Sequence, residues 1–247
     1  MPDLATTYLG LALKNPLVPS ASPLSRNLDT ALRLEDAGAA ALVMYSLFEE
    51  ELQAEDAMMD RFLLHSGLGH GEADGFMPDQ GELRGGQERY LEHLQRLKSR
   101  LAIPVVASLN GVSLSGWVEL GRALQEAGAD ALELNVYHVA ADMMKSGEAV
   151  EARYLDLLRE LRSVVSIPIV MKLSPFFSSL PHFVKQLEHA GAQGVALFNR
   201  FYQPDINLDT LCVVDQLHLS YPDEALLRIR WLSILHGRTH LTLAATG

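Results

Sequence analysis

The chain has 247 residues, 48% hydrophobic and 21% charged, which is enough for one large globular domain. Its 31 acidic and 20 basic residues give a formal net charge of −11, which argues against nucleic acid or an anionic membrane as a general partner. Cys212 is the only cysteine, so an intramolecular disulfide and a cysteine metal site are excluded. We find neither a signal peptide nor a run of eighteen apolar residues, and we therefore expect a cytoplasmic protein with no membrane span.

Short apolar stretches alternate with amphipathic stretches along most of the chain, which indicates alternating strands and helices. The predicted strands cover residues 15–22, 41–46, 104–111, 131–137, 167–175, 194–200 and 241–247. The predicted helices cover about residues 28–38, 87–101, 115–127, 150–165, 180–190 and 224–236. Two segments, 47–86 and 201–222, break the alternation and are predicted to be insertions at the mouth of the domain.

The residues at the start of the predicted strands alternate between two patterns along the chain. Odd strands begin at a proline, at positions 16, 104 and 168, and even strands follow Ala-Gly-Ala, at positions 37, 127 and 190. Alternating strands and helices require parallel crossovers, and no dinucleotide-binding glycine motif follows a strand. The pattern therefore predicts an α/β fold, a (β/α)8 TIM barrel, as a single domain over residues 1–247. Because only seven strands can be counted, we expect the barrel to be truncated after strand 7.

Lys172 lies near the C-terminal end of the apolar strand 167–175. A lysine is almost never fully buried without a partner. Two interpretations are open: a ligand or anion at the mouth of the strand, or a structural ion pair with a neighbouring strand.

The predicted C-terminal strand ends, where barrel enzymes hold their active sites, are polar and mostly neutral. They carry Ser20, Ala21, Ser22, Tyr45, Ser46, Ser108, Asn110, Asn135, Tyr137, His138, Lys172, Ser174, Asn199, Arg200, Thr246 and Gly247. Amides and hydroxyls with one or two cations suit a flat heteroaromatic ligand such as an isoalloxazine. The ring contains no carboxylate pair or metal-ligand cluster, and we expect no metal site.

Five motifs at these strand ends resemble the dihydroorotate dehydrogenase family, in its FMN-dependent, dihydroorotate dehydrogenase-like branch. They are Asn-Pro-Leu-Val-Pro-Ser-Ala-Ser at 15–22, Glu-Leu-Asn-Val-Tyr at 133–137, Val-Met-Lys-Leu-Ser-Pro at 170–175, Leu-Phe-Asn-Arg at 197–200 and Ala-Thr-Gly at 245–247. Their order along the chain makes the resemblance specific, and it extends from about Thr6 to the last residue.

The resemblance implies an FMN lying across the barrel mouth and a hydride passing between a small substrate and flavin N5. In this arrangement Ser20 and Ala21 pack near the flavin, whereas Ser108, Asn110 and Asn135 hydrogen-bond the flavin or the substrate. Lys172 lies beside flavin N1 and the C2 carbonyl, as a catalytic as well as a cofactor-binding residue. Asn199, Asn135 and Ser46 are the expected substrate-binding residues. Thr246 and Gly247 belong to the first phosphate-binding turn.

Two positions depart from the family pattern. His138 stands where dihydroorotate dehydrogenases have a cysteine or serine that takes the substrate proton, and histidine can be a base near neutral pH. Tyr45 and Ser46 occupy the region of the family's substrate-contacting lysine. The resemblance implies a small carbonyl-bearing, pyrimidine-like substrate and a place in pyrimidine biosynthesis, with His138 as the acid/base, whereas the two departures argue against dihydroorotate itself as the substrate. A homodimer is a possible assembly. The alternatives are a non-catalytic scaffold of barrel fold, or a flavin-free barrel enzyme acting on a phosphorylated substrate.

Overall fold

The computed structural model describes residues 2–48, 85–110, 116–136, 139–200, 205–214 and 220–247. Its centre is a six-stranded sheet with all neighbouring strands parallel, in the order β10-β7-β6-β5-β4-β3. The strands are β3 (Leu42–Phe48), β4 (Val105–Asn110), β5 (Ala131–Asn135), β6 (Ile169–Leu173), β7 (Gly194–Leu197) and β10 (Thr242–Ala245). Every residue of β4, β5, β6 and β7 is buried, as expected for parallel strands covered on both faces.

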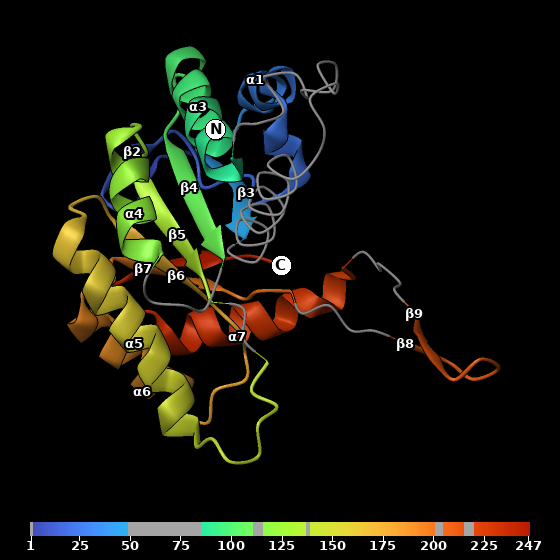
Figure 1. The fold of residues 1–247 in the computed structure, drawn as a ribbon. Coiled ribbons are helices and arrows are strands. Elements are labelled where there is room, and N and C mark those ends of the chain that lie inside the picture. Colours follow the sequence, from blue (N-terminus) through green and yellow to red (C-terminus); the bar gives the residue numbers. More distant parts are fainter. Residues whose placement is uncertain (1, 49–84, 111–115, 137–138, 201–204, 215–219) are drawn as a thin grey trace, which may run out of the picture.

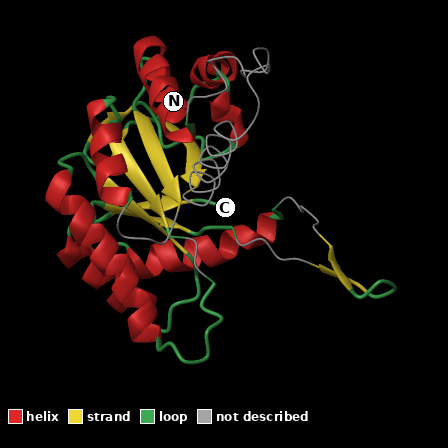
Figure 2. Cartoon of the chain, viewed as in Figure 1, coloured by secondary structure: helices red, strands yellow, loops and turns green. Residues whose placement is uncertain are grey.

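Helices surround the outer face of the curved sheet (Figure 1 and Figure 2). They are α1 (Leu28–Asp36), α3 (Gly86–Arg100), α4 (Trp117–Glu126), α5 (Gly147–Val164), α6 (Leu180–Ala190) and α7 (Ala225–Leu235). Their apolar sides pack with the outward residues of the strands into one large core. The alternation of parallel strands and helices confirms the predicted α/β barrel-like fold. The single domain with mouth insertions stays a prediction.

The opposite, inner face of the sheet has its own small apolar cluster. Val43, Val106, Ala131, Val170 and Ala196 come from five different strands and pack together there with Leu9. Leu9 is the turn residue of an N-terminal hairpin, β1 (Thr6–Tyr8) and β2 (Leu11–Leu13), which the sequence interpretation missed.

This hairpin covers the N-terminal ends of the strands. The backbone N–H of Leu9 donates to Oγ1 of Thr242, the first residue of β10, at 3.3 Å. A Cβ on Gly194, the first residue of β7, would lie 2.7 Å from Leu9 Cδ2, so only glycine allows this close approach. The inner face is therefore closed at one end, and a ligand would have to enter at the other.

The predicted first strand, 15–22, is wrong as a strand. The segment runs beside β3, where the carbonyls of Leu17 and Pro19 accept hydrogen bonds from Ala40 and Val43, each at 3.0 Å. Pro16 and Pro19 have no N–H, so the segment cannot donate the alternate bonds of a ladder. A 3-10 helix, η1 (Pro23–Arg26), follows it.

Little of the two predicted insertions is described. Leu47 and Phe48 belong to β3, and the rest of 47–86 lies outside the described residues up to position 84. The segment 201–222 contains a hairpin, β8 (Asp205–Asn207) and β9 (Cys212–Val214), which projects from the rest of the molecule in Figure 1. A second 3-10 helix, η2 (Pro222–Glu224), precedes α7.

Tyr90 of α3 supports an irregularity in β3. The register between β3 and β4 shifts between Val43 and Ser46, so backbone N–H and C=O groups there fall outside the regular inter-strand hydrogen bonding. The fully buried Tyr90 hydroxyl lies 3.0 Å from the carbonyl of Tyr45 and 3.3 Å from that of Ser108, and it accepts from the Ser108 N–H at 3.1 Å. Burial raises the pKa of Tyr90 far above its ordinary value, so the hydroxyl keeps its proton.

We expect Tyr90→Phe to lower the free energy of unfolding by about 1–3 kcal/mol, because it leaves buried backbone groups without a partner. Urea unfolding followed by circular dichroism measures the change. Tyr221→Phe, at a position where the side chain is exposed, is the matched control and should leave the stability unchanged. Equal stability of the Tyr90→Phe variant and the wild type would show that the hydroxyl does not support the irregular part of β3.

Candidate active site

A group of polar side chains lies on the inner face of the sheet, towards the C-terminal ends of the strands. Strand pairing sets Ser46, Ser108 and Glu133 level with one another on β3, β4 and β5. It sets Asn110, Asn135 and Lys172 level on β4, β5 and β6, two residues further along β4 and β5. These six residues are between 0% and 8% exposed. Alternation along β4, β5 and β6 places their residues on the same face as the inner apolar cluster, and on β3 the register shift between Val43 and Ser46 does the same.

Four of these side chains form a continuous polar row across β3, β4, β5 and β6. Ser46 Oγ lies 2.9 Å from Ser108 Oγ, Ser108 Oγ donates to Glu133 Oε1 at 3.3 Å, and Lys172 Nζ donates to the same oxygen at 3.3 Å. A carboxylate only accepts hydrogen bonds, so the single hydroxyl proton of Ser108 is donated to Glu133. Ser46 must then donate to Ser108, and the Ser46 oxygen can still accept a hydrogen bond.

Lys172 forms an ion pair with Glu133 of the neighbouring strand, and the two side chains are 8% and 4% exposed. This pair is the structural partner that one interpretation of the sequence required. It does not exclude the other interpretation, because both residues also lie at the inner, C-terminal part of the sheet, where a barrel binds its ligands. Glu133 was not predicted as a site residue. The signal was available, since a carboxylate in an otherwise buried apolar strand also needs a partner.

Glu133 and Lys172 are the only charged side chains on the inner face of the sheet, among the residues that the structure describes. Tyr8 lies near Glu133, and burial, reinforced by the charge of Glu133, raises the pKa of its phenol well above the ordinary value. Tyr8 is therefore neutral at physiological pH and adds no charge. The net charge of this described inner surface is zero.

Asn135 and Asn199 are brought together at the strand ends. Asn199 Nδ2 donates to Asn135 Oδ1, and the backbone N–H of Asn199 donates to the carbonyl of Leu173 at 2.7 Å. Nδ2 of Asn135 and Oδ1 of Asn199 lie outside that shared bond. The pair thus offers a further donor group, Nδ2 of Asn135, and a further acceptor, Oδ1 of Asn199, beyond the ends of β5 and β7, which suits a ring ligand with N–H and C=O groups.

Tyr154 of α5 fixes the end of β5 from the outer side. Its hydroxyl donates to the carbonyl of Val136 at 3.1 Å, and burial raises the pKa of Tyr154 to about 12, against a smaller opposing effect of Arg153. Val136 is the last described residue before position 139. His138, the predicted acid/base, therefore lies outside the described residues.

Thr246 and Gly247 follow β10 beside the buried Arg228 of α7. Arg228 Nε donates to the Thr246 carbonyl at 3.1 Å, and the Thr246 N–H donates to Leu197 at 2.8 Å. Gly247 has φ of 106°, and a Cβ there would lie 2.7 Å from the Phe198 carbonyl oxygen. Glycine is thus favoured at this position, whereas its predicted contact with a phosphate stays a prediction.

The other predicted residues have simpler surroundings. Ala21 packs at the edge of the inner apolar cluster, while Ser20 is exposed. Their predicted contact with a flavin is not tested. Within the described ranges no group of three or more His, Cys, Asp or Glu side chains comes together, and no described helix is long and apolar enough to cross a membrane.

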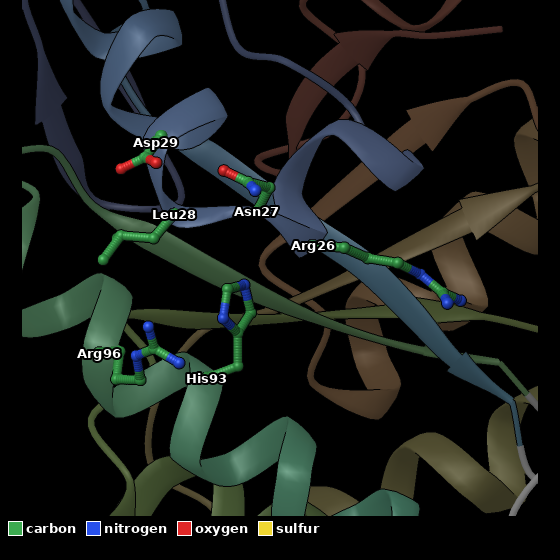
Figure 3. Close-up of a pocket in the computed structure, with 6 residues that line it drawn as sticks. All are labelled: Arg26, Asn27, Leu28, Asp29, His93 and Arg96. Carbon is green, nitrogen blue, oxygen red and sulfur yellow. The ribbon is translucent and has the colours of Figure 1, made fainter.

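A cavity of about 280 Å³ lies elsewhere, between η1, the start of α1 and α3 (Figure 3). It is lined by Arg26, Asn27, Leu28, Asp29, His93 and Arg96. His93 Nε2 is 2.6 Å from the Ser25 carbonyl, and the Arg26 guanidinium lies over the Tyr45 ring. This hollow is on the helical side of the sheet and does not include the inner polar row, so we do not assign the predicted site to it.

We expect Lys172→Met and Glu133→Gln each to lower the free energy of unfolding by about 3–5 kcal/mol, because each leaves a partner buried with its hydrogen-bond needs unmet. The double variant should lose less free energy of unfolding than the sum of the two single losses. Denaturant unfolding of the wild type, the two single variants and the double variant gives the coupling energy between the two residues.

The pair Lys98–Asp130, at 2.6 Å and with side chains 29% and 27% exposed, is the matched control. Its Lys98→Met variant should lose about 1 kcal/mol or less. Additive losses for Lys172 and Glu133 would show that the two charges do not depend on each other.

No family model matches the chain, but its sequence is similar to several curated proteins. The catalytic subunit of dihydroorotate dehydrogenase B (NAD(+)) from Thermoplasma acidophilum is 32% identical over 197 residues, which cover 78% of this chain and 61% of the relative. The corresponding subunit from Geobacillus kaustophilus is 26% identical over 214 residues, 85% of this chain and 65% of the relative. Dihydroorotate dehydrogenase A (fumarate) from Lactobacillus delbrueckii subsp. bulgaricus is 30% identical over 143 residues, 56% of this chain and 46% of the relative.

Among solved structures, an IMP dehydrogenase/GMP reductase-like protein from Corynebacterium glutamicum is similar, with a TM-score of 0.50 and 14% identity over 99% of this chain and 60% of that one. This likeness supports the barrel-like fold alone. The chain spans 61% of the length of the Thermoplasma acidophilum relative. Several relatives of one kind, 22–32% identical over about four fifths of the chain, agree with the five strand-end motifs. These matches support a dihydroorotate dehydrogenase-like family for this chain.

Proposed function

We propose that this protein is an FMN-dependent oxidoreductase of the dihydroorotate dehydrogenase kind, acting on a CH–CH bond of a small carbonyl-bearing, pyrimidine-like substrate. The observation that carries the proposal is the buried polar row of Ser46, Ser108, Glu133 and Lys172 at the ligand-binding end of a parallel sheet. The proposal extends to a role in pyrimidine biosynthesis. The cytoplasmic location and the homodimer stay predictions, and sedimentation of the purified chain tests the second.

The residues present fit FMN. The described part of the site offers one ammonium, two hydroxyls and three amides above an apolar inner cluster, and a flat ring with carbonyls and ring nitrogens needs such donors and acceptors. When bound, FMN supplies a hydride acceptor or donor at N5 and gains negative charge near N1 on reduction. Lys172 is the residue that stabilises this charge, because its ammonium is held in place before the reaction.

The other residues of the site orient the two ligands. Ser108 and Asn110 bind the flavin edge, Ser20 and Ala21 line its neighbourhood, and Thr246 with Gly247 begins the phosphate-binding turn. Asn135, Asn199 and Ser46 bind the substrate. In this arrangement the acceptor oxygen of Ser46 and the amide donor of Asn135 select a ring with both N–H and C=O groups.

The purified protein should absorb in the visible range, alone or after addition of FMN. Lys172→Met should weaken FMN binding about tenfold or more, a loss of roughly 1.4 kcal/mol, because the ring loses its fixed cation. A titration followed by flavin fluorescence measures this. Lys98→Met, which removes another carboxylate-paired lysine at the opposite end of the strands, should bind FMN as the wild type does. Unchanged binding by Lys172→Met would remove Lys172 from the cofactor site.

His138 is the proposed acid/base of the reaction with the substrate. His138→Asn should slow reduction of the bound flavin by dihydropyrimidines, dihydroorotate included, by about 10²- to 10⁴-fold, since proton abstraction loses its base. Stopped-flow absorption measures that rate, and FMN affinity should stay at the wild-type value. A rate equal to the wild type would assign proton transfer to another group.

A further inference from the structure

We infer that Glu133 is a positioning residue that holds the Lys172 ammonium in place and, through its own negative charge, limits how strongly the site favours reduced over oxidised flavin. This inference rests on the proposed function and deepens it. It concerns a residue that neither the motifs nor the family resemblance singled out as functional.

The strand register makes Glu133 an anchor that lies beneath the lysine. Lys172 is level with Asn135 on β5, and Glu133 lies two residues earlier on the same strand, one inward-facing position deeper. The 3.3 Å contact between Lys172 Nζ and Glu133 Oε1 therefore fixes the flexible lysine from the closed end of the sheet. Ser108 holds the carboxylate in turn, at 3.3 Å, so the anchor is itself oriented.

The pair has no net charge, which changes its effect on a ligand at the mouth. A single ammonium would act there as a full positive charge, whereas the pair acts as a dipole whose positive end is nearer the mouth. Tyr8 is neutral, and the inner face carries no further charge in the described ranges. Glu133 therefore opposes most of the stabilisation that Lys172 alone would give to an anionic ring.

The test compares four proteins: wild type, Glu133→Gln, Lys172→Met and the double variant. For each, FMN affinity is measured in the oxidised and in the reduced state, together with the midpoint potential of the bound flavin. The preference for reduced FMN should rise about tenfold in Glu133→Gln and fall about tenfold in Lys172→Met. The double variant should lie between wild type and Lys172→Met, because it loses a dipole whose positive end faces the ring.

Controls separate this inference from the proposed function. Asp130→Asn removes another lysine-paired carboxylate, at the opposite end of the strands, and should keep the wild-type preference and potential. If the wild type binds FMN and Glu133→Gln leaves its preference unchanged or lowers it, the inference is wrong and the proposed function stands.

If none of the four proteins binds FMN, the inference about Glu133 and the proposed function are both wrong. If Glu133→Gln does not fold, the double variant is compared with Lys172→Met. The double variant lacks the negative charge that Lys172→Met keeps, so its preference for reduced FMN should be higher. Equal preferences in these two variants would overturn the inference.

Discussion

The ion pair between Glu133 and Lys172 is the constraint on which the inner half of the molecule depends. Two opposite charges are almost completely buried on neighbouring strands, and each is tolerated only because the other is within 3.3 Å. The pair ties β5 to β6 in one register, since a slip of either strand by one residue would turn its charge toward the outer core of aliphatic side chains and leave the other charge unpaired. The hydroxyls of Ser46 and Ser108 then extend the same polar contact to β4 and β3.

The rest of the architecture isolates this row from the outer core. Outward-facing strand residues pack with the helices, and Tyr90 and Tyr154 reach from the helices only to backbone groups. The polar row therefore shares no side-chain partner with the helical layer in the described contacts. A site arranged in this way can change its ligand chemistry through a few side chains without disturbing the core, as loop and strand-end variation does in barrels generally.

The strands and helices after residue 22 could be predicted because each carries a local signal. Alpha-helical periodicity and the Ala-Gly-Ala ends located α1, α3, α4, α5, α6 and α7 within a few residues, and apolar runs located the six strands. The segment 15–22 misled because its composition resembles a strand, while its prolines remove the donors that a ladder needs. The N-terminal hairpin was missed because two three-residue strands give almost no pattern, and its stability comes from Leu9 packing on distant strands.

The site was predictable where a residue is unusual for its local setting, as Lys172 is in a buried strand. Glu133 met the same criterion, but the motif drew attention to Asn135, two residues later. Its partner could be identified only once pairing of β5 with β6 set the register, because sequence alone gives no inter-strand distances. The mutual contact of Asn135 and Asn199, 64 residues apart, likewise depends on two strand ends meeting in space.

Leu9 has a consequence for how the chain folds. It packs beside Gly194, and its backbone bonds Thr242, 233 residues later in the chain. Contacts of such long sequence separation form late, because the loop that they close is costly in entropy. During synthesis the hairpin of β1 and β2 is made before β7 and β10, so it cannot find its binding surface until they have emerged. The closed end of the inner face is thus completed only after the sheet itself, when the hairpin meets β7 and β10.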